Sequence, residues 1–108
     1  MSTYLTRARY SQEAFKGMIA KPEDREVAAK AMFGAAGMKL HNMWYSGNGE
    51  VICIVEGTAV SGAAVGMVVL ASGAFTSVES TELMTMAQMV EAMGSAGAVA
   101  AKFRPPGK

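Results

Sequence analysis

The sequence has few of the residues on which covalent and metal chemistry usually depend. Its 108 residues include one cysteine, Cys53, and one histidine, His41. A single thiol excludes a disulfide within the chain and a thiolate cluster built by one chain. No second group of ligand-type residues accompanies the histidine, so we expect no metal site. The lone cysteine and an N-terminus without a signal-peptide pattern favour a cytoplasmic location.

Charge is also scarce, at 18% of residues, and the formal net charge is +1. The ten basic and nine acidic residues are spread along the chain, without the basic cluster that phosphate backbones select, so we expect no nucleic-acid binding. Hydrophobic residues make up 51% of the chain. Subunit contact is the least costly cover for surplus apolar surface in so small a chain. The composition therefore predicts a homo-oligomer, at least a dimer.

One stretch of seventeen uncharged residues, from Ala59 to Phe75, is close to the length that spans a membrane. Glycines and serines dilute it, and no Lys or Arg flanks either end. The spacing of Gly62 and Gly66 suits a helix packed close to a sheet. We therefore expect a buried helix and no membrane partner.

Periodicity and turn residues predict eight elements. Ser11 and Thr58 are good N-caps, Pro22 suits the first turn of a helix, and Gly47-Asn48-Gly49 is typical of a hairpin turn. Gly37 and Gly73 fit helix C-termini. The predicted strands are Thr3–Tyr10, Met38–Ser46, Val51–Glu56 and Ala74–Leu83, and the predicted helices are Ser11–Met18, Pro22–Gly37, Thr58–Ala71 and Met84–Ala101.

This order predicts the α+β class, with a ferredoxin-like β-α-β-β-α-β chain, a four-stranded antiparallel sheet and an extra C-terminal helix. The first and third strands should be central, and the helices should cover one face of the sheet. Two uncovered faces that meet would form a dimeric α/β barrel around a cavity. Residues 1–101 then form one domain, and residues 102–108 a flexible tail.

At this level of element order the sequence resembles the GYD domain family, within the wider dimeric α/β-barrel group. The similarity covers roughly the first eighty-five residues. It is diffuse rather than a sharp motif. The residues that carry it are Thr3-Tyr4-Leu5, Arg25 with the Ala-rich stretch to Gly37, Lys39-Leu40, Trp44-Tyr45-Ser46, Glu50 to Glu56, Leu70 to Gly73, and Thr81-Glu82-Leu83.

One departure from the family lies in the hairpin. The Gly-x-Tyr-Asp stretch that names the family is here Gly47-Asn48-Gly49-Glu50, so the Tyr is missing and Glu replaces Asp. A function of that Tyr-Asp pair cannot be carried over intact. The wider group implies small-molecule binding, cofactor-free oxygenation, cyclisation or haem chemistry, and fold does not decide among them. No cofactor is predicted, and whether the chain is an enzyme stays open.

Arg7 and Arg9 share one face of a predicted central strand with Leu5. Buried charge is costly unless paired, so this placement needs an explanation. One interpretation is a cavity wall in which Arg7 and Arg9 hold an anionic or carbonyl-bearing ligand. The other is a structural ion pair of Arg7 with Glu50, Glu56 or Glu79.

His41 is the second candidate catalytic residue beside Arg7. It alternates with Lys39, Met43 and Tyr45, and it could act as a general base or an axial haem ligand. The alternative is a partly exposed strand histidine. Trp44 and Tyr45 point to opposite faces, so one could stack on a ligand, or both could be core or interface residues.

The remaining residues favour packing over chemistry. Cys53, on an interior strand, is most simply a small buried hydrophobe. Met86, Met89 and Met93 form one helical stripe, which favours a subunit interface over copper binding. Two hypotheses therefore remain: a small-molecule-binding or catalytic barrel that uses Arg7, His41 and Tyr45, and an accessory oligomer without an active site.

Overall fold

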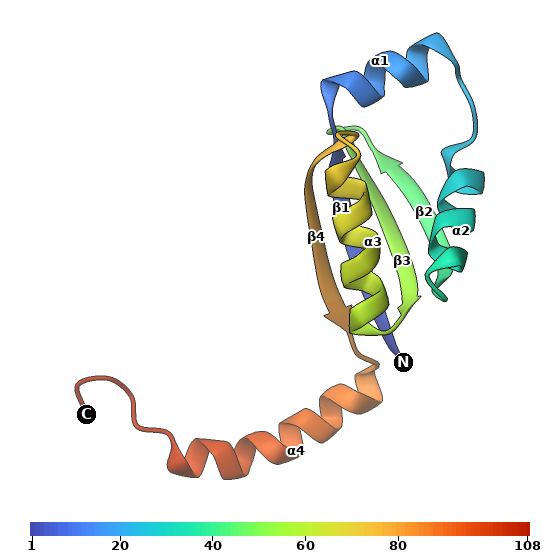
Figure 1. Ribbon diagram of the computed structural model, residues 1–108. Coiled ribbons are helices and arrows are strands. Elements are labelled where there is room, and N and C mark those ends of the chain that lie inside the picture. The colour runs from blue at the N-terminus through green and yellow to red at the C-terminus, as the bar shows by residue number, and fades with distance from the viewer.

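The computed structural model describes all 108 residues as one antiparallel four-stranded sheet with four helices. The strand order is β2-β3-β1-β4, so the first and third strands are central, and the predicted ferredoxin-like α+β fold is confirmed (Figure 1). The elements are β1 (Ser2–Tyr10), α1 (Gln12–Ala20), α2 (Arg25–Ala35), β2 (Lys39–Ser46), β3 (Glu50–Gly57), α3 (Ala59–Ala71), β4 (Phe75–Leu83) and α4 (Met86–Lys102).

Each helix begins at a side chain that caps it. The Ser11 hydroxyl accepts a hydrogen bond from the backbone N–H of Ala14, and Thr58 accepts one from Ser61 in the same way. Thr85 forms a capping box with Gln88 at the start of α4. Helix α2 differs from the expectation. Its N-cap is Asp24, so Pro22 lies in the preceding connection and not in the first turn.

Two irregularities in the sheet change which residues share a face. The register of β2 shifts between Leu40 and Asn42, and that of β4 shifts opposite Arg9 and Tyr10. After the first shift Tyr45 pairs with Val51, and it faces the helices. The expected alternation of His41 with Met43 and Tyr45 is therefore wrong, because the bulge at His41 separates them.

The second shift places an aromatic residue against the core. Phe75 pairs with Tyr10, and the two rings stack with their centroids 4.9 Å apart. Val78 pairs with Ala8, so Phe75 and Val78 both face the helices, although strict alternation predicts opposite faces. The bulge adds an aromatic pair to the end of the sheet from which α1 continues.

The core lies between the sheet and two helices. Figure 1 shows α3 over the middle of the sheet and α2 near its β2 edge, while α1 lies beyond the sheet's end. Only ten residues are buried in this single chain. The nine that form the core are Ala8, Tyr10, Phe33, Met38, Leu40, Val51, Cys53, Val55 and Val65.

Helix α4 stands apart from the rest of the chain. It projects from the end of β4 into solvent (Figure 1), and none of its residues is buried. The radius of gyration is 18.0 Å, whereas about 13 Å is typical for this length. None of the four helices combines the length and the apolarity that a membrane-spanning segment needs.

Candidate functional site

A cavity of ≈ 440 Å³ lies between the sheet and helices α2 and α3. We call it the helix-side cavity. Strands β1, β3 and β4 form its floor, and 18 of its 22 lining residues are hydrophobic. Its size falls within the range of roughly 300–1,000 Å³ that small-molecule sites occupy. Its walls include Ala29, Met32 and Phe33 from α2, and Gly62, Val65, Gly66 and Val69 from α3.

Two of the α3 residues that line the cavity are glycines, Gly62 and Gly66. Gly66 lines the cavity, and a Cβ added to it would meet no atom within 4 Å. At Gly62 an added Cβ would only reach Met38, at 3.8 Å. The glycine spacing predicted a helix that packs close to the sheet. In the structure Gly62 lies within van der Waals reach of Met38, whereas Gly66 leaves space beneath α3 unfilled.

Two hydroxyl groups supply polarity in the floor of the cavity. Thr6 and Ser80 pair across β1 and β4, and their side-chain oxygens lie 3.1 Å apart. Tyr4, one step along the same face of β1, also lines the cavity. A hydroxyl can donate one hydrogen bond and accept others, so this pair could orient one polar group of an otherwise apolar ligand.

Cys53 lies in the floor of the helix-side cavity and is 5% exposed. Burial raises the pKa of its thiol from 9.0 to about 11, and the nearby Glu26 carboxylate adds to the shift. The thiol is therefore neutral at physiological pH and is a poor nucleophile. This agrees with the expectation of a small buried hydrophobe.

The helix-side cavity contains few titratable groups. Tyr4 and Cys53 are the only titratable residues among its lining residues. No carboxylate, imidazole or basic side chain reaches it, and no group of three or more His, Cys, Asp or Glu residues in the chain could hold a metal ion. The arrangement is suited to binding more than to bond-breaking.

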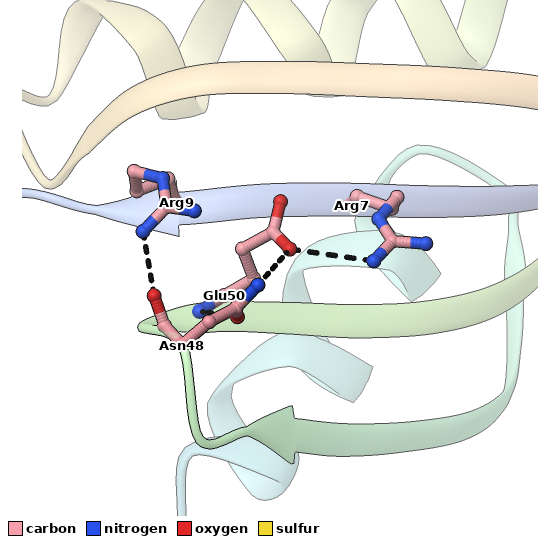
Figure 2. Close-up of polar contacts among 4 residues, drawn as sticks. All are labelled: Arg7, Arg9, Asn48 and Glu50. Carbon is pink, nitrogen blue, oxygen red and sulfur yellow. Dashed lines mark hydrogen bonds and ion pairs between the residues drawn. The ribbon is translucent and has the colours of Figure 1, made fainter.

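The arginines singled out in the sequence lie on the opposite, uncovered face of the sheet (Figure 2). Arg7 Nη2 lies 3.4 Å from Glu50 Oε1, and Arg9 Nη1 donates to the backbone carbonyl of Asn48 at 2.6 Å. The Asn48 side-chain amide donates to the same Glu50 oxygen at 3.0 Å. The hairpin thus supplies a partner for each arginine: the Glu50 carboxylate for Arg7 and the Asn48 carbonyl for Arg9.

This network changes the ionisation of Glu50. The hydrogen bond from Asn48 lowers the pKa of the Glu50 carboxyl, and the hydrogen bond and charge of Arg7 lower it further. Arg7 therefore has an intramolecular partner, which is the structural alternative left open by the sequence. Glu50, the first residue of β3 after the hairpin turn, provides that partner.

The predicted site residues do not form one constellation. His41 Nε2 lies 2.9 Å from Glu56 Oε1, at the end of β3 opposite to Glu50. These two glutamates are six positions apart along an extended strand, or about 20 Å. Trp44 lies on the uncovered face opposite Ile52, and Tyr45 faces the other way. A ligand-binding role for Arg7, Arg9, His41, Trp44 or Tyr45 stays a prediction.

Sequence reasoning did not select the residues of the helix-side cavity. Tyr4, Thr6 and Ala8 alternate with Leu5, Arg7 and Arg9 along β1, and their face is part of the cavity floor. The pairing of Thr6 with Ser80 joins residues 74 positions apart. Only the register of β1 and β4 reveals it, because neither hydroxyl belongs to a local motif.

Comparison with known proteins identifies the family. The family model described as GYD domain matches residues 4–93. This confirms the resemblance that the strand and turn residues indicated. The match contains all the cavity residues, both polar networks of the uncovered face and the first half of α4. No match was found among curated proteins.

Proposed function

We propose that this chain, which belongs to the GYD domain family, is a binding protein for a small, mainly apolar molecule held in the helix-side cavity. The observation that carries the proposal is the cavity itself, ≈ 440 Å³ in volume and lined by hydrophobic residues between α2, α3 and the sheet. Apolar cavities with a few convergent polar groups are typical of small-molecule sites.

The chemistry of the lining narrows the class of ligand. The walls are aliphatic, aromatic and thioether groups, so most of the ligand should be hydrocarbon. No charged group of the protein reaches the cavity, and an ionised ligand would lose its hydration without compensation. The hydroxyls of Thr6 and Ser80 favour one neutral hydroxyl or carbonyl group. We therefore propose a neutral ligand with a single polar end.

The lining also favours binding over catalysis. General acid–base work needs a group whose pKa lies near the working pH, and the Cys53 thiol, at about 11, is well away from it. A carrier, sensor or sequestering protein needs no such group.

The first test is binding of 1-decanol and of decane, measured by native mass spectrometry and by thermal unfolding. We expect one molecule of 1-decanol per chain and a melting temperature that rises with its concentration, since a ligand of the folded state stabilises it. Thr6→Val keeps the shape of the side chain and removes its hydroxyl. It should weaken 1-decanol binding by about 10-fold, the effect of one lost hydrogen bond, and leave decane unaffected.

The same test distinguishes ligand binding from the main alternative, an accessory oligomer. If neither probe binds and the melting temperature does not move, the binding function is rejected. An accessory oligomer without a ligand site would then account for the apolar composition. Equal weakening of both probes by Thr6→Val would reject the polar anchor and keep the cavity.

A further inference from the structure

Helix α4 is amphipathic, and its apolar face has no partner within the chain. At 100° per residue, Met86, Met89, Val90, Met93 and Gly97 fall in one stripe. The side chains of Gln88, Glu91, Ser95 and Lys102 lie on the opposite side. The three methionines of the stripe are 73%, 41% and 56% exposed. An apolar helical stripe normally faces a core, so this one indicates a missing contact.

The exposed area is large enough to be an interface. The chain exposes 7565 Å², whereas a compact monomer of 11.3 kDa exposes about 5,700 Å². The excess of about 1,800 Å² is more than the roughly 800 Å² that each partner contributes to a stable interface. A second copy that covers this excess would bring the chain into the normal range.

The uncovered face of the sheet provides a matching surface. Leu5 and Ile54 pair across β1 and β3, and Trp44 pairs with Ile52 across β2 and β3, so four apolar side chains lie together on this face. The ion pair of Arg7 with Glu50 and the hydrogen bond between His41 and Glu56 lie beside them. This apolar strip crosses the middle of the sheet and has no helix over it. Arg9, Lys39 and Glu79 lie on the same face, around the strip.

The apolar stripe of α4 and the uncovered sheet face agree in length. Helix α4 has 17 residues and is about 26 Å long, and β1 has nine residues and is about 30 Å long. The only charged residues of α4, Glu91 and Lys102, lie away from its apolar stripe. Docking by this stripe would therefore bury no charge of the helix without a partner.

We propose that α4 is an exchange arm: in a two-fold dimer, its apolar stripe packs on the uncovered sheet face of a second copy of the chain. Such an interface is reciprocal, because each chain donates one arm and receives the other. A membrane surface is a poorer occupant, since a surface-bound helix carries several basic residues on its polar side, and α4 has only Lys102. The proposal concerns the sheet face opposite the helix-side cavity and does not depend on the binding function.

The first experiment compares two single charges placed two residues apart. Met93→Glu adds a carboxylate to the stripe, and Ser95→Glu adds one to the polar side of the same helix. Analytical ultracentrifugation should show a dimer for the wild type and for Ser95→Glu. Met93→Glu should raise the dimer Kd by at least about 30-fold, the effect of an interface hot spot. A wild type that sediments as one species of 11.3 kDa, or equal effects of the two variants, overturns the proposal.

The second experiment locates the contact by disulfide trapping in a Cys53→Ala background. A chain with Met93→Cys is mixed with a chain with Ile54→Cys and oxidised, and a non-reducing gel reports the mixed dimer. We expect this dimer, and we expect none when Ser95→Cys replaces Met93→Cys. A dimer from Met93→Cys alone would mean that the arms pair with each other. A dimer from Ile54→Cys alone would mean that the sheets meet face to face, as in a barrel. Either result without the mixed dimer overturns the exchange of arms.

Discussion

The Arg7 guanidinium on β1 lies 3.4 Å from the Glu50 carboxylate at the start of β3. The Arg7 side chain is 43% exposed and that of Glu50 15%, so the charge on the central strand is neither buried nor alone. This pair explains why a basic residue is tolerated at the centre of the sheet. It also decides what a substitution of Arg7 should do.

Arg7→Met is expected to lower the melting temperature by no more than a few degrees. The substitution leaves the Glu50 carboxylate with Asn48 as its remaining side-chain donor. The effect is small because solvent screens an exposed pair. Thermal unfolding in parallel with Lys39→Met provides the control, since Lys39 makes no ion pair on the same sheet face. If Arg7→Met and Lys39→Met unfold at the same temperature, the pair contributes nothing to stability.

The pH dependence of stability follows from the lowered pKa of Glu50. Its folded-state pKa lies below the ordinary value of 4.5, because Asn48 and Arg7 stabilise the carboxylate. The stabilisation is therefore fully present above pH 4.5 and is lost as the pH falls through the folded-state pKa. Urea unfolding of the wild type and of Glu50→Gln should give midpoints that converge on acidification below pH 4.5. Curves that stay equally separated down to pH 2 would show that the carboxylate's ionisation is not the cause.

The sequence predicts the fold more fully than the site, for physical reasons. N-caps such as Ser11 and Thr58 act through neighbours three residues away, so local patterns locate the helices correctly. A bulge depends on the partner strand. For that reason the shift near His41, which turns Tyr45 to the other face, could not be read from alternation.

The site depends still more on distant pairing. Thr6 and Ser80 form the polar group of the cavity only because β1 and β4 are neighbours. The stripe of Met86, Met89 and Met93 predicts an interface helix, but not that α4 projects away from the sheet. Long-range register and the direction of a helix after a short connection are properties of packing, not of local sequence.

Val55→Ala should destabilise the protein by about 2 kcal/mol, because Val55 is 2% exposed and its methyl groups lie in the core. Val60→Ala removes the same atoms from an exposed position of α3. It should be neutral or slightly stabilising, since alanine is the better helix former. Chemical denaturation of both variants measures the difference. Equal destabilisation would mean that the core lies elsewhere.

Gly66→Leu should fill the helix-side cavity from above. A Cβ at Gly66 meets no atom within 4 Å, so the side chain can start into free space, and leucine also improves the helix propensity of α3 by about 0.8 kcal/mol. We expect higher stability together with loss of 1-decanol binding. Gly34→Leu is the matched control, because Gly34 lies in α2, has equal space and does not line the cavity. Retained 1-decanol binding by Gly66→Leu would place the ligand outside the cavity.

The most direct measurement of ligand occupancy uses the thiol in the cavity floor. Cys53 is the only cysteine, so the rate of its alkylation by N-ethylmaleimide at pH 8 reports access to this one position. If the helix-side cavity holds an apolar molecule, saturating 1-decanol should slow the alkylation by about 10-fold or more. The protection should disappear in Gly66→Leu, whose rate no longer responds to 1-decanol. An alkylation rate of the wild type that is the same with and without 1-decanol would contradict the account.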